Sequence, residues 1–181
     1  ALGELLIDFT ENGVSGQGNP LFEANPGGAP CNVLAMLSRL GHRTAFIGKV
    51  GNDFFGKQLE DAITEVGIDA AGLLKDDKVH TTLALVHTYP DGDRDFSFYR
   101  NPGADMMLTE EELPEEIIRG AKIFHFGTLS FTHAGIRTAS QYAIQCAKEA
   151  GALISFDPNL REPLWENLED ARKAIEYGME C

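Results

Sequence analysis

The chain has 181 residues, of which 43% are hydrophobic, and a formal net charge of −13 at pH 7. This length and composition suit one globular domain with an apolar core. The negative charge argues against a nucleic-acid partner, because binding to phosphates draws most of its affinity from lysine and arginine. No apolar run approaches the roughly 20 residues that cross a bilayer, so we expect no membrane partner. Three cysteines without metal or disulfide spacing are typical of a reducing, cytoplasmic setting.

Apolar periodicity predicts an alternation of strands and helices along the chain. Pro30 near the start of the first helical pattern and Gly41 just after its end are residues that helix termini select. Between the first strand and this helix, residues 10–25 are rich in Gly and Asn and indicate a loop or an edge hairpin. The expected elements are strands at 2–9, 44–50, 122–126 and 152–157, and helices at 32–40, 55–66, 133–150 and from about 165.

Two further β-rich runs, at residues 81–89 and 94–100, interrupt this alternation. They flank Pro90-Asp91-Gly92-Asp93, a sequence typical of hairpin turns. The alternation elsewhere predicts an α/β fold with a mostly parallel sheet flanked by helices, in which ligands bind at the carboxyl ends of the strands. The hairpin falls outside that arrangement. We therefore predict a small β lid, with segments at about 10–25 and 80–101.

Polar and glycine residues follow the first predicted strand. Asp8 lies near its carboxyl end, where the carboxylate could accept hydrogen bonds from two hydroxyls or could cap a turn. Gly27 and Gly28 would let the backbone approach a ligand at a helix start. Asn32 offers a donor and an acceptor to vicinal hydroxyls. The same residues would also suit an ordinary loop with a helix cap.

Two later segments also carry hydrogen-bonding groups. Phe98 and Arg100 end the predicted hairpin, where they could cover a carbohydrate or belong to a solvated edge strand. Asn159 and Arg161 follow the strand at 152–157 and fall at a carboxyl end. Arg161 could hold a transferring phosphoryl group there, or could pair with a surface acid.

One segment approaches the pattern of a phosphate-binding loop, Gly51-Asn52-Asp53-Phe54-Phe55-Gly56-Lys57-Gln58. Its bulky phenylalanines would keep backbone amides from converging on a phosphate, and glutamine replaces the Ser or Thr that would ligate magnesium. We interpret it as a turn between strand and helix. The sequence shows no metal-ligand cluster and no Ser-His-Asp arrangement, so no metal ligand is assigned.

The order of these motifs resembles one family. The run Gly27-Gly28-Ala29-Pro30-x-Asn32, then a helix, Gly41 and Phe46-Ile47-Gly48-x-Val50-Gly51-x-Asp53-x-x-Gly56, resembles the first signature of the PfkB sugar kinases. Residues 1–9, 98–105 and 157–161 are similar to the fructokinase branch of that family. The resemblance covers essentially the whole chain and implies a ribokinase-like fold.

The resemblance also implies roles for the residues named above. Sugar hydroxyls would be bound by Asp8, the Gly27-Gly28 pair and Asn32. Phe98, Arg100 and Asn159 would lie at the substrate, and Arg161 would stabilise the transferring phosphate. ATP and Mg²⁺ are the expected cofactors, a small sugar is the expected substrate, and the lid is expected to join two copies of the chain as a homodimer.

The sequence departs from the family pattern in one respect. The Asn-x-x-Glu motif associated with magnesium should follow the last predicted helix, and the Gly-Ala-Gly-Asp motif should supply the anion hole and the general base. Neither motif occurs between the start of that helix and Cys181. We therefore interpret residues 1–181 as the N-terminal part of a ribokinase-like domain, without its C-terminal nucleotide-binding part and inactive alone.

The parent protein is expected to be an ATP-dependent fructokinase. Kinases for 2-keto-3-deoxygluconate or aminoimidazole riboside remain alternatives within the family, because they share nearly all of these motifs. A non-catalytic sugar-binding or dimerisation module is the alternative from another class.

Overall fold

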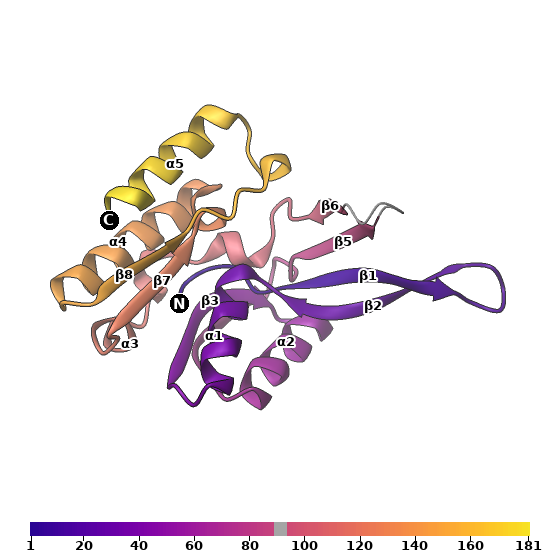
Figure 1. Cartoon of the computed structure of the whole chain (residues 1–181), viewed down its shortest axis with the longest axis horizontal. Coiled ribbons are helices and arrows are strands. Elements are labelled where there is room, and N and C mark those ends of the chain that lie inside the picture. Colours follow the sequence, from indigo (N-terminus) through magenta and orange to yellow (C-terminus); the bar gives the residue numbers. More distant parts are fainter. Residues whose placement is uncertain (89–93) are drawn as a thin grey trace.

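Helices flank a parallel sheet, and a separate group of strands projects from it (Figure 1). The computed structural model describes residues 1–88 and 94–181, so the turn expected at 90–93 lies outside the described residues. Within these two ranges, no helix is both long enough and apolar enough to cross a membrane.

The parallel sheet consists of two strand pairs that the first residues of the chain join. Leu2, which is fully buried, forms parallel bridges to Ile47 and to Phe126, one in each pair. Its N–H donates to the carbonyl oxygen of His125 at 2.9 Å. The two pairs are β3 (Thr44–Gly51) with β4 (Ile68–Asp76), and β7 (Ile123–Gly127) with β8 (Leu153–Asp157).

Helices cover the sheet and enclose two apolar clusters. One cluster, around Leu5, Phe46 and Leu59, lies beside β3 and β4, and the other, around Phe126 and Ile144, lies beside β7 and β8. Both consist of buried side chains, and the burial of apolar surface is the main source of stability for such a fold. The helices are α1 (Ala29–Arg39), α2 (Phe54–Glu65), α3 (Glu115–Arg119), α4 (Ala134–Glu149) and α5 (Leu168–Glu180).

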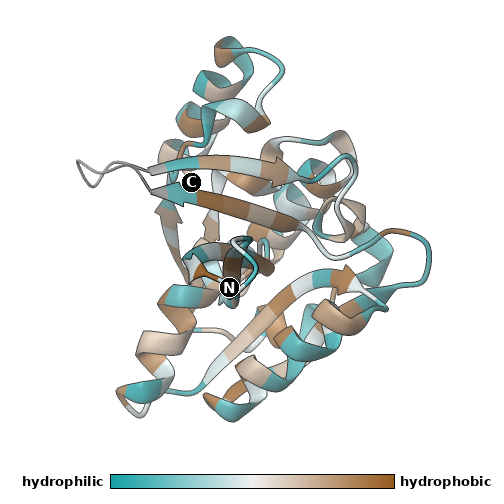
Figure 2. Ribbon diagram, turned by 90° about the vertical axis from the view of Figure 1, so that its right-hand side faces the viewer, coloured by the Kyte–Doolittle hydropathy of each residue, from teal (hydrophilic) through white to brown (hydrophobic). Residues whose placement is uncertain are grey.

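The projecting strands form a separate sheet, the lid sheet, in the order β2-β1-β5-β6. β1 runs antiparallel to β2 and parallel to β5, and β5 runs antiparallel to β6. Figure 2 shows the hydrophobic body of β5 beside the more polar β6. The strands are β1 (Leu6–Val14), β2 (Pro20–Gly27), β5 (Leu83–Thr88) and β6 (Arg94–Tyr99).

The structure corrects one predicted element, decides between two alternatives for another, and adds a strand. The strand expected at 2–9 is divided, because residues 1–3 pair within the parallel sheet whereas β1 leaves it at Leu6 for the lid sheet. Residues 10–25 form the edge hairpin that the sequence offered as the alternative to a loop, because they belong mainly to the antiparallel strands β1 and β2. β4 was not expected, because its Asp69-Ala70-Ala71-Gly72 stretch is poor in the residues that favour strands.

Candidate active site between the sheet and the lid

One face of the lid sheet carries an acid and two aromatic rings. Asp8 lies opposite Ala84, and Ala84 lies opposite Phe98, so these side chains share a face. Phe96, two residues before Phe98, points the same way and stacks on it with ring centroids 5.9 Å apart. Both rings are partly buried, whereas Tyr99 on the other face is 64% exposed. We call the surface formed by Asp8, Thr10, Ala84, Val86, Phe96 and Phe98 the Asp8 face.

Gly27 and Gly28 lie at close approaches at the junction of β2 and α1. A Cβ atom on Gly27 would overlap the carboxylate of Asp8, and one on Gly28 would overlap the backbone carbonyl oxygen of Glu4. Gly28 also has a φ of 123°, which side chains other than hydrogen disfavour. The glycine pair therefore lets the Asp8 carboxylate lie directly against the backbone that leads into α1.

The carboxyl group of Asp8 lies in a partly buried setting. Burial raises the pKa of Asp8, and the positive charge of Arg161 opposes that shift. Arg161 comes from the loop after β8, so its charge reaches the Asp8 face from the carboxyl end of the parallel sheet. The structure thus brings together an acid from the lid sheet and a cation from the main sheet, as ligand binding between the two would require.

The loop that carries Arg161 turns at Asn159. This residue has a φ of 34°, in the left-handed region that asparagine tolerates better than most residues. Its N–H and its side-chain Nδ2 both donate to the carboxylate of Asp157, at 3.1 and 3.2 Å. The side chain that sequence reasoning placed at the substrate is therefore engaged in forming the turn.

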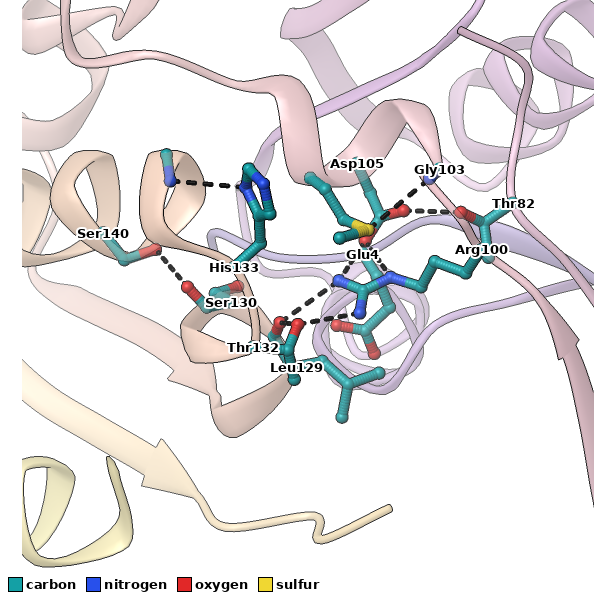
Figure 3. Close-up of polar contacts among 12 residues, drawn as sticks. Glu4, Thr82, Arg100, Gly103, Asp105, Leu129, Ser130, Thr132, His133 and Ser140 are labelled. Atoms are coloured by element: carbon teal, nitrogen blue, oxygen red, sulfur yellow. Dashed lines mark hydrogen bonds and ion pairs between the residues drawn. The ribbon is translucent and has the colours of Figure 1, made fainter. Parts of the chain in front are cut away.

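Arg100 is buried where β6 leaves the lid sheet (Figure 3). Its side chain is 2% exposed, and Nη2 lies 2.6 Å from the carboxylate of Asp105. Nη1 donates to Oγ1 of Thr132 at 2.8 Å, and Nη2 to the carbonyl oxygen of Leu129 at 3.2 Å. The structure therefore places Arg100 inside the protein, where it ties the lid sheet to the loop after β7, instead of directing its guanidinium toward open space.

Asp105 and Glu4 are buried acids that the sequence did not reveal as important. Asp105 accepts from Nε of Arg100 at 2.8 Å and from Oγ1 of Thr82 at 2.5 Å. Glu4 accepts from the N–H of Ala29 at 2.9 Å, at the start of α1. Burial raises the pKa of Glu4 to about 7, against the hydrogen bonds that it accepts. Periodicity cannot show burial of this kind, because it depends on contacts between distant segments.

Asn32 lies in the first turn of α1 with an exposed side chain. Its backbone N–H donates to the carbonyl oxygen of Gly28 at 3.0 Å, which begins the helix and leaves the side-chain amide to other partners. Asn32 therefore lies one helical turn from the glycine pair, within the same segment of the chain.

The segment that approaches the phosphate-loop pattern forms a turn held by a carboxylate. Asp53 accepts from the N–H of Gly56 at 2.8 Å and from both the N–H and the hydroxyl of Thr81, at 2.9 and 2.7 Å. Burial alone would raise the pKa of Asp53, but the hydrogen bonds from Thr81 and Gly56 outweigh it and lower the pKa. The turn thereby connects β3 and α2 to the residues just before β5 of the lid sheet. Among the residues that the structure describes, no cluster of His, Cys, Asp or Glu could hold a metal ion.

Comparisons with known proteins identify the family to which this parallel α/β sheet with its separate β sheet belongs. The model of the pfkB family carbohydrate kinases matches residues 1–179, so the chain belongs to this family. This confirms the resemblance expected from the sequence and the ribokinase-like α/β fold.

Similar proteins and structures carry the name fructokinase. The chain is 50% identical to "Probable fructokinase-3" of Arabidopsis thaliana over 97% of this chain and 51% of that protein. The fructokinase structure from Xylella fastidiosa has a TM-score of 0.92 and 36% identity, covering 98% of this chain and 55% of that one. A double-mutant fructokinase from Vibrio cholerae O395, with bound fructose, ADP and potassium, has a TM-score of 0.87 and 30% identity over 98% and 55%. The chain therefore spans about half the length of the relatives that it matches.

Proposed function

We propose that the protein carrying this chain is an ATP-dependent fructokinase, and that residues 1–181 form its sugar-binding part and its lid. The observation that carries the proposal is the Asp8 carboxylate, which lies against the Gly27 backbone on the face that also presents Phe98. A carboxylate accepts hydrogen bonds from vicinal hydroxyls, and an aromatic ring covers the apolar face of a sugar. The names of the similar proteins support fructose as the substrate.

Each residue of the site has a distinct role in this proposal. Asp8 accepts sugar hydroxyls, while the Gly27-Gly28 backbone and the Asn32 amide provide further hydrogen bonds. Arg161 neutralises charge on the phosphoryl group during transfer. Arg100 and Asn159 act indirectly, since the first holds the loop after β7 and the second forms the turn that presents Arg161.

ATP and Mg²⁺ are the cofactors in this proposal. A fructokinase structure from Xylella fastidiosa contains ATP, and bound ATP with Mg²⁺ supplies the phosphoryl group in such enzymes. Arg161 suits a phosphate, because no described acid lies within ion-pair distance of its guanidinium. No described cluster suits a metal ion, and the sequence contains no Gly-Ala-Gly-Asp segment. We therefore propose that residues 1–181 alone do not transfer phosphate.

A homodimer joined through the lid sheet, in the cytoplasm, completes the proposal. Exposed apolar side chains on the lid strands support it, because a lone solvated sheet would expose few of them. They are Val14, Leu21 and Phe22, which are 63%, 47% and 44% exposed. Sedimentation of the complete gene product would test the dimer, and a monomer at micromolar concentration would contradict it.

A coupled assay of the complete gene product tests the activity. We expect ADP release that depends on fructose, with a higher kcat/KM for fructose than for 2-keto-3-deoxygluconate or aminoimidazole riboside. Asp8→Asn should lower kcat/KM by about 100-fold, because the amide replaces one acceptor of hydroxyl protons with a donor. Preference for one of the other sugars would support an alternative kinase of the family. Fructose binding without ADP release would support a non-catalytic sugar-binding module.

A further inference from the structure

Arg161 contacts the lid sheet through an aromatic ring. Its guanidinium carbon Cζ lies 5.4 Å from the centroid of the Phe96 ring, within the range of a cation–π interaction. Arg161 belongs to the loop after β8, whereas Phe96 belongs to β6. The contact therefore joins the carboxyl end of the parallel sheet to the lid sheet.

Phe96 is placed to present its ring from the Asp8 face. It lies opposite Val86, which in turn lies opposite Thr10, one row further along the lid sheet than Asp8. Phe98 stacks against Phe96 with an angle of 13° between the rings, which restricts the orientation of the ring under the cation. The aromatic surface is thus held by a neighbouring ring and by strand pairing.

Most hydrogen-bond donors of Arg161 remain available for a ligand. Nη1 donates to the carbonyl oxygen of Leu160 at 3.1 Å, and among the described residues no carboxylate lies within ion-pair distance of the guanidinium. An arginine that rests on an aromatic ring keeps its N–H groups in the plane of the guanidinium, free to bind an anion in bidentate fashion. The turn at Asn159, just before Arg161, also restricts the backbone of this loop.

We infer that Phe96 is a positioning residue for Arg161, so that the lid sheet orients the group that contacts the transferring phosphate. This inference rests on the proposed kinase function. Strand β6 would then do more than cover the sugar. The contact between Phe96 and Arg161 would link the position of the lid sheet to the orientation of the arginine that binds the phosphate. In this inference Phe96 acts on the phosphate through Arg161.

Two substitutions of Phe96 distinguish the effect of its aromatic ring from the effect of its side-chain volume. Phe96→Leu keeps an apolar side chain but removes the ring, and should lower kcat/KM for fructose about three- to thirtyfold, the range that cation–π energies imply. The loss should fall mainly on kcat, because Asp8 and the glycine pair still bind the sugar. Phe96→Tyr keeps the ring and should restore activity to within about twofold of the unaltered protein.

Phe54→Leu is the matched control, since it makes the same change at an exposed phenylalanine of α2, outside the lid sheet and the proposed site, and should leave both constants unaltered. Equal activity of Phe96→Leu and the unaltered protein would overturn the inference. A loss in Phe96→Tyr as large as that in Phe96→Leu would also overturn it, because bulk or packing would then explain the effect.

A spectroscopic measurement on the complete gene product tests the contact without relying on activity. The ¹Hε–¹⁵Nε signal of Arg161, assigned by its loss in Arg161→Lys, should show a ring-current shift that disappears in Phe96→Leu and persists in Phe54→Leu. An unchanged signal in Phe96→Leu would refute the contact. If the protein phosphorylated no sugar, the kinase function would be refuted, and the signal would still show separately whether Phe96 holds Arg161.

Discussion

Glu4 lies just before β1 of the lid sheet and is only 4% exposed, and such burial is rare for an acidic side chain. Its acceptor role toward the Ala29 N–H needs an oxygen but no charge. Burial raises its pKa to about 7 from an ordinary value of 4.5. The folded protein therefore holds a proton on Glu4 through a pH range in which the unfolded chain has released it.

Glu4→Gln should remove this pH dependence. Between pH 4.5 and about 7 the folded state binds one proton more than the unfolded state, so the stability of the unaltered protein falls as pH rises and levels off above about 7. Glu4→Gln should match the unaltered protein near pH 4.5 and exceed it at pH 8 by an amount on the order of 3 kcal/mol. Urea unfolding at several pH values would measure this. Parallel curves for the two proteins would contradict the prediction, and the exposed Glu11→Gln serves as control.

Single residues differed in how far the sequence could predict them. Asp8, Gly27 and Gly28 were predicted together as ligand-binding residues. The antiparallel pairing of β1 with β2 brings the Asp8 carboxylate against Gly27, whereas Gly28 lies against the backbone of Glu4. Arg100 and Asn159 lie at the expected loops, but their side chains bind Asp105 and Asp157. Sequence can indicate which segment reaches a site, whereas the direction of one side chain depends on partners elsewhere.

At the scale of elements, the turn between β3 and α2 gives a structural reason for the acid and the glycines in the family signature Gly51-x-Asp53-x-x-Gly56. Asp53 caps α2 and also holds Thr81, so one side chain fixes a helix and the base of a lid strand. A Cβ on Gly56 would overlap the carbonyl oxygen of Gly51. These residues of the signature therefore hold a turn together. The turn shares its glycines with a phosphate-binding loop but lacks the small residues between them.

Asp53→Ala should destabilise the protein by about 2–4 kcal/mol, since it removes a helix cap and leaves the N–H and hydroxyl of the buried Thr81 without their acceptor. Asn167→Ala is the matched control, because Asn167 caps α5 in the same way but holds no second segment. That change should cost about 1 kcal/mol. The comparison uses urea unfolding at pH 7, and equal losses would show that the link to Thr81 adds nothing.

Element boundaries were predictable where local signals set them. Gly41 and Gly67 follow α1 and α2 with positive φ, as helix ends require. The division of residues 2–9 between two sheets was not predictable. An apolar run looks the same whether it forms one strand or two, and only pairing with β3, β7 and β5 decides where it divides.

At the scale of the whole molecule, β8 forms an edge of the parallel sheet. Among the described strands it pairs only with β7, and Leu153 at its start is 70% exposed. A strand edge with an exposed apolar side chain can pair with another chain, and lysine at such an edge discourages that pairing. We expect residues 1–181, expressed alone, to associate through this edge.

Leu153→Lys should therefore increase the soluble, monomeric fraction of residues 1–181, as measured by size-exclusion chromatography. Leu40→Lys is the matched control, because Leu40 is 65% exposed but follows helix α1 instead of lying on a sheet edge. It should change the fraction much less. An equal gain from both substitutions would indicate that general surface polarity, and not the strand edge, controls association.

The bridges made by Leu2 have a consequence for the order of folding. Residues 1–3 precede both of their partners in the chain, and the pairing with His125 must wait until β7 has been synthesised. β1 with β2, by contrast, and β3 with β4 are close in sequence and can form early on the ribosome. The bridge from Leu2 to Ile47 can therefore form before the bridge to Phe126, and the two strand pairs of the main sheet can be joined only after β7 has been synthesised.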